Sequence, residues 1–301
     1  MGSPNSKPEE KIDYCPDPAL TTKIEEQGKL IEEQNRKLEE EKQKNSDTSA
    51  ASKTLKKEMD RLTRERDNLM KAMTTQSNNF REEMKIFTES NSAVANQLKK
   101  IQADLAKENI HSLDDLPKAE DARYRKIMEL CAQVGKAPID QTGHNVGFLG
   151  DTSVGKSTLI NKLMGENVCA VGHGEVTVAM KPYRKAHTNY VYWDMPGKND
   201  KISYLSATYI GTIKGMSFIG IMVRSTTNEM SKMIELMAYL NIKFNVIVNH
   251  IDSVEEDEVE AFKAQIRKEM DGNSFCQNIF FISAKKQSGD WLNLVDAITR
   301  A

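Results

Sequence analysis

The sequence is poor in cysteine and has no long apolar run. Its four cysteines, Cys15, Cys131, Cys169 and Cys276, are far apart and form no C-x-x-C pair. Such spacing argues against a disulfide framework or a zinc cluster and is typical of reduced thiols in the cytoplasm. The longest strongly apolar run, Phe218–Val223, is much shorter than the roughly 18 residues that a membrane-spanning helix needs. We therefore expect a cytoplasmic protein that is neither secreted nor integral to a membrane.

An excess of charge of one sign is also missing. The formal net charge is −2 at pH 7, from 42 Lys and Arg residues against 44 Asp and Glu residues. The two signs are interspersed, so the sequence predicts no single-signed field of the kind that attracts nucleic acid. We therefore expect no nucleic-acid partner, and a small molecule or another protein instead.

Proline and glycine are absent from a long central stretch. No proline lies between Pro18 and Pro117, and no glycine lies between Gly28 and Gly135, while Glu, Lys, Gln, Leu and Met are abundant. These residue types favour long helices. Residues 1–18, by contrast, hold four of the eight prolines among polar residues, a composition that predicts a disordered tail.

Apolar residues of the helical stretch recur at the spacing of a coiled coil. A weak heptad, Ile24, Ile31 and Leu38, precedes Asn45–Ser52, where we expect a joint. We predict a helical, coiled-coil region over residues 19–117 and a helical linker over 118–143, with self-association or partner capture as the function. The alternative is a solvated helix that packs back on the globular domain. The stronger repeat consists of Leu55, Met59, Leu62, Leu69, Met73, Phe80, Phe87, Val94 and Ile101.

From His144 onward, short apolar segments alternate with amphipathic helical ones. This alternation predicts an α/β domain over residues 144–301, with a mostly parallel six-stranded sheet and flanking helices. Strands are expected near Asn145–Leu149, Val176–Tyr183, Tyr190–Trp193, Phe218–Val223, Phe244–Val248 and Ile279–Ile282.

A phosphate-binding loop follows the first of these strands. The stretch Gly150–Thr158 matches G-x-x-x-x-G-K-S/T, and it lies between an apolar strand and a helical run. Its glycines let backbone amides surround a phosphate, and the helix N-terminus adds partial positive charge. We expect Lys156 to reach the terminal phosphates and Ser157 to bind Mg²⁺.

Two later motifs predict that the base is guanine. Asn249-His250-Ile251-Asp252 matches N-K-x-D except at His250, and it follows an apolar strand. The carboxylate of Asp252 can accept hydrogen bonds from the two donors on the guanine edge, which adenine lacks. His250 can cover the base without the lysine stem, so the departure bears on affinity rather than specificity. Ser283–Lys285 supplies a backbone amide for the guanine carbonyl. GTP and GDP are thus the expected ligands.

A further motif concerns the γ-phosphate. Asp194 ends a strand and is followed by Pro196 and Gly197, which places a carboxylate near the magnesium shell and an amide near the γ-phosphate. Lys198 stands where a small GTPase would carry its water-orienting glutamine. We expect slow intrinsic hydrolysis, with the missing element supplied in trans.

Together these residues resemble a Ras-like P-loop G domain of the translation-factor-related class, spanning His144–Ala301. A narrower resemblance, to the immunity-related GTPases, rests on Gly174–Thr177, Pro182–Tyr183, Trp193–Gly197 and Asn161–Leu163. That family has its extra helices after the G domain, whereas here the helical mass precedes it.

The resemblance to the immunity-related GTPases implies roles for two loop residues. Thr177 would bind Mg²⁺ and the γ-phosphate, and Glu175 would assist hydrolysis across a dimer whose nucleotides face each other. The alternative is that Glu175 is a solvated carboxylate and Thr177 merely opens a strand.

The expected site combines catalytic, magnesium-binding and nucleotide-binding residues. Catalysis is assigned to Lys156, Glu175, Thr177 and Gly197. Magnesium is assigned to Ser157, Thr177 and Asp194. Nucleotide contacts are expected from Gly150, Asp151, Thr152, Ser153, Val154, Gly155, Lys156, Ser157, Thr158, Asn249, His250, Asp252, Ser283, Ala284 and Lys285.

The N-terminus bears on where the protein acts. Residues 1–6 fit the M-G-x-x-x-S/T pattern for myristoylation of Gly2, although an unmodified tail is the alternative. One acyl chain binds membranes only marginally, so a second signal such as lipidated Cys15 would be needed. The leading hypothesis is an oligomerising GTPase that acts at membranes if lipidated. The alternatives are a nucleotide-gated adaptor with negligible hydrolysis and a structural protein with a degenerate G domain.

Overall fold

A computed structural model describes residues 18–44, 49–108, 122–139, 143–169, 180–195 and 206–301. The chain divides into two compact units. One unit runs from Met84 to the C-terminus, apart from Arg184–Thr188. The other contains those five residues and the described chain from Pro18 to Glu83.

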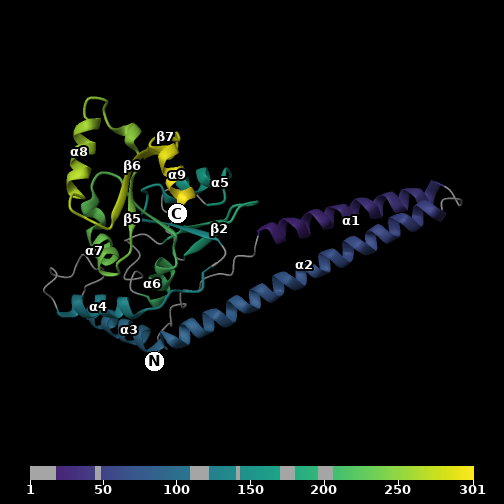
Figure 1. The fold of residues 1–301 in the computed structure, drawn as a ribbon, viewed down its shortest axis with the longest axis horizontal. Helices are drawn as coiled ribbons and strands as arrows, with labels where there is room; N and C mark the ends of the chain where they lie inside the picture. The colour runs from purple at the N-terminus through teal and green to yellow at the C-terminus, as the bar shows by residue number, and fades with distance from the viewer. Residues whose placement is uncertain (1–17, 45–48, 109–121, 140–142, 170–179, 196–205) are drawn as a thin grey trace. The chain divides into compact units, whose positions relative to one another are not determined.

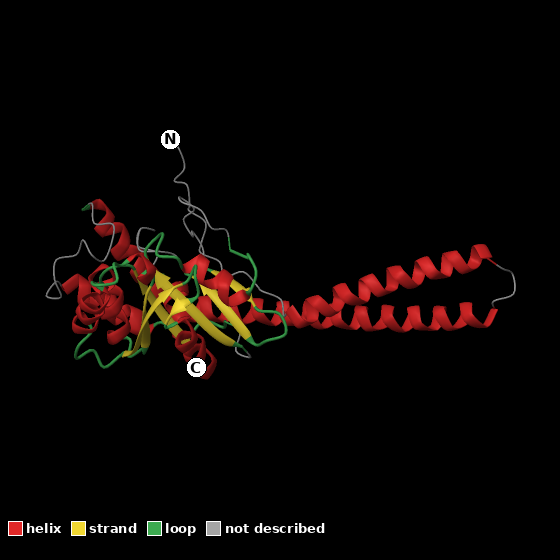
Figure 2. Ribbon diagram, turned by 90° about the horizontal axis from the view of Figure 1, so that it is seen from above, coloured by secondary structure: helices red, strands yellow, loops and turns green. Residues whose placement is uncertain are grey.

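The second unit is built from helix α1, Pro18–Lys44, and the larger part of helix α2, Ser49–Ser90. The two helices run alongside each other in both views (Figures 1 and 2). Of the predicted joint, Asn45–Ser52, residues 45–48 lie outside the described part, and Ser49–Ser52 belong to α2.

The apolar stripe of α2 is not fully exposed within this single chain. Leu62 is buried, and Leu55, Met59 and Met73 are half-buried. Helix α1 of the same chain runs alongside α2 (Figure 2). Pairing of this stripe with a second chain stays a prediction.

The first unit is built on a seven-stranded sheet of order β2-β3-β1-β4-β5-β6-β7. The pairs β1–β3, β1–β4, β4–β5 and β5–β6 are parallel, and β6–β7 is antiparallel. The carboxyl ends of β1, β4, β5 and β6 therefore meet at one edge. The strands are β1 His144–Gly150, β2 Lys181–Arg184, β3 Tyr190–Asp194, β4 Phe218–Val223, β5 Phe244–Val248, β6 Cys276–Ser283 and β7 Ser288–Gly289.

The expected count of six strands was wrong, because β7 adds a seventh. This strand is only two residues long, too short to show the alternation by which a strand is recognised in a sequence. Its glycine, Gly289, has a φ of 70°, and a Cβ there would lie 2.2 Å from the carbonyl oxygen of Phe281. The expected strand at Val176–Tyr183 is described only from Met180 onward, where β2 begins at Lys181.

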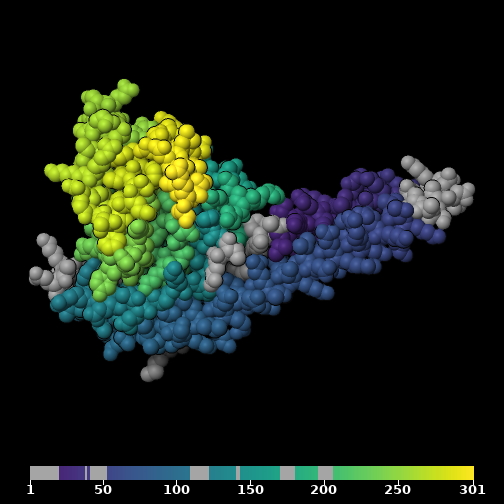
Figure 3. All heavy atoms as spheres, in the orientation of Figure 1, coloured from purple at the N-terminus to yellow at the C-terminus, as the bar shows by residue number. Residues whose placement is uncertain are grey.

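Helices flank both faces of the sheet. One face, with Val146 and Phe148 of β1, packs against Leu159 of α5 and Leu294 of α9. Figure 1 shows α7 and α8 on the opposite side from α5 and α9, and Figure 3 shows α8 and the C-terminal residues at the surface. The helices of this unit are α3 Ser92–Lys107, α4 Ala122–Gln133, α5 Lys156–Met164, α6 Ala207–Lys214, α7 Ser231–Tyr239, α8 Val259–Glu269 and α9 Trp291–Arg300, with the 3₁₀ turns η3 Thr227–Met230 and η4 Ile251–Ser253.

The helices before the sheet pack on the same unit. Helix α3 contacts α4 and α6, and α4 contacts α7. Leu98 and Leu105 of α3 and Ile127 of α4 are buried, as expected for helices whose apolar faces cover other helices. In this part of the helical region, the helices pack back on the globular unit, which was the alternative to self-association. The domain boundary predicted from the sequence lies at residue 144, whereas the described part of this compact unit begins at Met84.

Polar contacts reinforce this packing. The Lys214 ammonium, at the end of α6, donates to the carbonyl oxygens of Cys131 (3.0 Å), Ala132 (2.9 Å) and Val134, where α4 ends. The hydroxyl of Tyr124 donates to the carboxylate of Glu235 in α7 at 2.6 Å. Cations near a helix C-terminus stabilise its unpaired carbonyl groups.

No helix in the described part of the chain is both long and apolar enough to cross a membrane.

Candidate nucleotide-binding site

The P-loop connects β1 to α5 and depends on two glycines. Gly150 has a φ of 153° and Gly155 has a φ of 97°. A Cβ at Gly150 would lie 2.5 Å from the carbonyl oxygen of Met222, and one at Gly155 would lie 2.3 Å from Nδ2 of Asn249. Real Cβ atoms do not approach so closely, so the loop can fold this way only with glycine at both positions.

The loop surrounds the ammonium group of Lys156. Its Nζ donates to the carbonyl oxygens of Gly150 at 2.9 Å and Asp151 at 3.0 Å, and the residue is 6% exposed. Helix α5 begins at Lys156, so the first unpaired amides of the helix face the same loop. A buried cation beside a helix N-terminus is suited to hold phosphate.

A hydroxyl and a carboxylate meet next to this cation. The Ser157 hydroxyl donates to Oδ2 of Asp194 at 3.0 Å, and Asp194 is buried at the carboxyl end of β3. Phe148 of β1 is paired with Asp194 in the sheet, which fixes this neighbourhood. Two oxygen donors of this kind fit Mg²⁺, which prefers oxygen ligands and shares them with nucleotide phosphates.

Three predicted catalytic residues, Glu175, Thr177 and Gly197, lie outside the described residues. Their assigned roles stay predictions.

The chain leading into residues 170–179 is held by Asn161 of α5. The side-chain oxygen of Asn161 accepts from the amides of Val168 (2.9 Å) and Cys169 (2.7 Å), and its Nδ2 donates to the carbonyl of Cys169 (2.9 Å). In the sequence, Asn161 contributes only to the resemblance to the immunity-related GTPases. Its anchoring role was missed, because a buried asparagine in a helix has no sequence signature.

Asn249 joins the P-loop to the loop after β6. Its Nδ2 donates to the carbonyl of Val154 at 2.8 Å, and its Oδ1 accepts from the amide of Ala284 at 2.9 Å. The residue is 2% exposed. Residues of three separate motifs therefore lie together. The amide of Ala284 is engaged by Asn249, a detail that the sequence did not specify.

His250 lies against the P-loop in a left-handed backbone conformation, with a φ of 67°. Its Nε2 would lie 3.8 Å from a Cβ on Gly155. This nitrogen is buried and has no hydrogen-bond partner among the described residues. Burial, followed by the nearby charge of Arg224, lowers the pKa of His250 against a smaller opposing effect of Asp252. The imidazole is therefore neutral at pH 7.

Asp252 has a partner that the sequence did not predict. Its Oδ2 lies 3.0 Å from Nζ of Lys286. Hydrogen bonds from Lys286 and Ser283 lower the pKa of the Asp252 carboxyl. Of the expected tripeptide, Ser283 and Ala284 are buried and Lys285 is exposed. The carboxylate is thus ionised at neutral pH, as guanine recognition requires.

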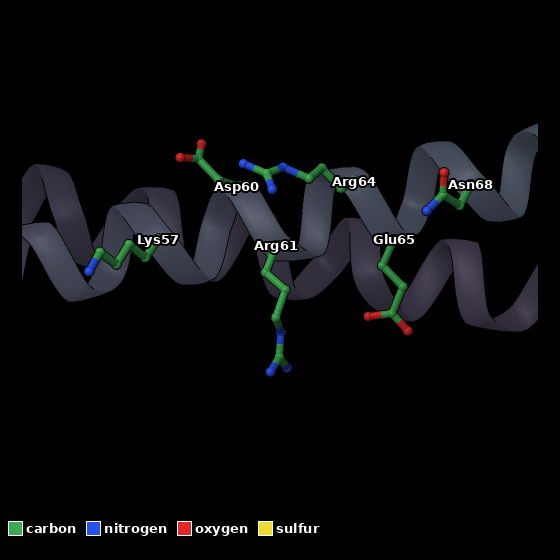
Figure 4. Close-up of a pocket in the computed structure, with 6 residues that line it drawn as sticks. All are labelled: Lys57, Asp60, Arg61, Arg64, Glu65 and Asn68. Carbon is green, nitrogen blue, oxygen red and sulfur yellow. The ribbon is translucent and has the colours of Figure 1, made fainter.

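A hollow on α2 of the second unit holds none of these motifs. Figure 4 shows its six lining side chains, which carry charges of both signs and point in different directions. Such an open, mixed-charge surface is typical of a solvated helix face. The lining residues are Lys57, Asp60, Arg61, Arg64, Glu65 and Asn68.

A family model described as 50S ribosome-binding GTPase matches residues 145–269. The match covers less than half of the chain, from β1 to α8, and includes the P-loop, Asp194 and Asn249–Asp252. Residues 145–269 are thus similar to a P-loop GTPase G domain, and the match includes the motifs whose geometry is described above. The narrower resemblance to immunity-related GTPases stays a prediction.

Several solved GTPase structures are similar to this chain. A variant of Era from Aquifex aeolicus bound to GDP and AlF4⁻ is 23% identical, with a TM-score of 0.43, over 52% of this chain and 56% of that one. Era in complex with MgGDPNP and 16S ribosomal RNA is 20% identical, with a TM-score of 0.43, over 53% and 56%. A probable GTP-binding protein, EngB, is 22% identical, with a TM-score of 0.38, over 52% and 97%.

The matched region thus spans a little more than half the length of the Era structures. No curated protein matches the sequence. The expectation of no nucleic-acid partner stays a prediction from charge alone.

Proposed function

We propose that this protein hydrolyses GTP to GDP and phosphate, using Mg²⁺. The proposal rests mainly on one observation: Lys156, the Ser157–Asp194 pair and Asp252 lie along the edge where the parallel strands β1, β3 and β5 end. Ligands of open α/β sheets bind at such an edge. When bound, Mg²⁺ neutralises charge on the phosphates.

Each described residue has a distinct part in this reaction. Lys156 holds the terminal phosphates and stabilises the charge that develops as the bond to the γ-phosphate breaks. Ser157 and Asp194 hold the magnesium, and Asp252 selects guanine. Because phosphoryl transfer depends mainly on position and charge, these fixed groups supply most of what the protein must provide.

The remaining step is proposed to need a second molecule. Lys198 cannot orient the attacking water in the way that a glutamine does, which favours a contribution in trans. We propose that two G domains face each other and that Glu175 assists hydrolysis across the interface, with Thr177 and Gly197 closing on the γ-phosphate.

The test is GTP turnover per protein molecule, with Mg²⁺, across a wide range of protein concentrations. We expect the specific rate to rise with concentration, and Glu175→Ala to abolish that rise while GTP still binds. Lys156→Ala is the control for contaminating activity. A flat rate in a protein that binds GTP would contradict association-coupled hydrolysis.

A second candidate, a nucleotide-gated adaptor with negligible hydrolysis, is favoured by the packing of α6. This helix follows residues 196–205 in the chain. Phe87 packs next to Gly211 of α6, and Lys214 of α6 donates a hydrogen bond to the carbonyl of Cys131 at the end of α4. A shift of α6 with the nucleotide would reach the N-terminal helices. Hydrogen exchange of α3 and α4 that differs between GDP and a non-hydrolysable GTP analogue, with negligible turnover, would favour this candidate.

Action at membranes is proposed only together with lipidation. Mass spectrometry of the protein from cells would detect a myristoyl group on Gly2, and Gly2→Ala would remove it. We expect the lipidated protein to float with vesicles and the substituted protein to remain in solution.

A further inference from the structure

The guanine-recognising carboxylate is already engaged in an ion pair. Nζ of Lys286 lies 3.0 Å from Oδ2 of Asp252. Guanine presents two donors on one edge, N1–H and the N2 amino group, and a carboxylate meets them with its two oxygens. The Lys286 ammonium therefore binds one of the atoms that the base would use.

The backbone that carries Lys286 is fixed by the β6–β7 hairpin. Ser283 is paired with Ser288, and Ile282 with Gly289, across the turn. The amide of Lys286 donates to Oγ of Ser283 at 3.3 Å. Gln287, which ends the turn, has a φ of 53°. Because both ends of this turn are paired, Lys286 is held close to η4, which carries Asp252.

The side chains differ in exposure, which limits the strength of the pair. The Lys286 side chain is 63% exposed and the Asp252 side chain is 25% exposed. Ion pairs with this much solvent contact contribute little, and their effect on an equilibrium is at most several-fold. Such a pair is strong enough to compete with a ligand and weak enough to be displaced by one.

We propose that Lys286 competes with guanine for the Asp252 carboxylate and thereby lowers the affinity of the site for guanine nucleotides. This inference rests on the proposed function. It adds an affinity-determining residue that no part of the N-H-x-D or Ser-Ala-Lys motifs contains. Removing the ammonium frees Oδ2 of Asp252 from this ion pair while the hydrogen bond from Ser283 remains, so affinity for the base rises.

The first experiment measures the dissociation constant for GDP by calorimetry, in the presence of Mg²⁺. We expect Lys286→Met to bind GDP about two- to fivefold more tightly than the unsubstituted protein. The control is Lys107→Met, which breaks an exposed pair in α3, where Nζ lies 2.8 Å from Oδ1 of Asp104. We expect that control to bind GDP like the unsubstituted protein.

A double-mutant cycle isolates the Asp252 contact. Asp252→Asn replaces the carboxylate by an amide, which can pair with xanthine and cannot attract Lys286. In this background we expect Lys286→Met to leave the affinity for xanthosine diphosphate unchanged. A tightening of the same size there would mean that Lys286 acts through the phosphates or through general charge, which would overturn the inference.

The outcomes separate the inference from the proposed function. If Lys286→Met binds GDP equally or more weakly, Lys286 is neutral toward the base or supports it, and the inference is wrong although the GTPase proposal stands. If the unsubstituted protein fails to bind GDP, the proposed function fails, and the inference fails with it.

Discussion

The left-handed glycines of this chain differ in what surrounds them. At Gly155 a side chain would meet Asn249, whereas at Gly165, with a φ of 82°, no described atom lies within 4 Å of the Cβ position. The two glycines bracket α5 as its caps. Substitutions at the two positions can therefore distinguish the free-energy cost of left-handed backbone strain from the effect of disrupting the P-loop on nucleotide binding.

We therefore expect Gly155→Ala to abolish GDP binding and Gly165→Ala to preserve it. The second change should cost only the left-handed strain of an alanine, about 1 to 2 kcal/mol of unfolding free energy. Calorimetry with GDP and chemical denaturation measure the two effects. Normal GDP binding by Gly155→Ala would show that the contact with Asn249 is dispensable.

Asn161 offers a second prediction for a single residue. Asn161→Ala removes three hydrogen bonds that hold Val168 and Cys169. The buried Cys169 loses the side-chain partner of its amide and of its carbonyl, whereas the half-buried Val168 amide keeps its contact with the carbonyl of Glu166 at 3.2 Å. We expect a loss of about 1 to 3 kcal/mol of unfolding free energy, because unpaired buried polar groups are costly. Asn161→Asp, which keeps the acceptor for the two amides, should lose less. Equal losses in thermal or urea unfolding would contradict this account.

At the scale of the elements, Glu269 at the end of α8 is hydrogen-bonded to the start of the turn η3. Its carboxylate accepts from the amide and hydroxyl of Thr227, from the hydroxyl of Thr226 and from Gln265. Burial raises the pKa of Glu269, but these hydrogen bonds together lower it more, so the pKa lies below its ordinary value of 4.5.

The lowered pKa of Glu269 makes its contribution to stability depend on pH. The unfolded chain binds the proton at higher pH than the folded one, so the contribution of Glu269 is complete above pH 4.5 and is lost as the pH falls through the folded pKa. We expect Glu269→Gln to cost about 1 to 2 kcal/mol at pH 7. In urea unfolding, the gap to the unsubstituted protein should narrow below pH 4.5. If the difference in unfolding free energy between the two proteins does not change with pH, then the stabilising contacts do not depend on an ionised Glu269 carboxylate.

The elements also mark what a sequence can and cannot predict. The P-loop and the five strands joined in parallel pairs have strong local signatures, namely glycines at fixed spacing and apolar runs between turns. Strand β7 was missed because two residues carry no periodicity. Lys286 was missed because its partner Asp252 is far away in the sequence, and only the hairpin brings them together.

The helical region shows the same limit. Its apolar spacing predicted helices with a buried face, and that is what α3 and α4 have. The spacing does not identify the surface that covers the face, because Leu98 presents the same pattern to a second chain or to α6. The roles of Glu175, Thr177 and Gly197 in hydrolysis stay predictions.

At the scale of the whole molecule, the unit boundary at Met84 can be tested directly. Helices α3 and α4 bury Leu98, Leu105 and Ile127 within the unit that carries the sheet. A chain that starts at Met84 keeps these contacts, whereas a chain that starts at His144 exposes the surfaces of α6 and α7 that they cover. Large exposed apolar surfaces lead to association or unfolding.

We therefore expect the chain 84–301 to fold cooperatively and to bind GDP as the full chain does, and the chain 144–301 to aggregate or to unfold at lower denaturant concentration. Light scattering, urea unfolding and GDP calorimetry on both chains make the comparison. Lys214→Met in the longer chain is an intermediate case, because it removes only the link to the end of α4. If the chain 144–301 is as stable as the chain 84–301, then the G domain does not require α3 and α4 for stability. The adaptor hypothesis would then be weakened, because it depends on the packing of these helices against α6.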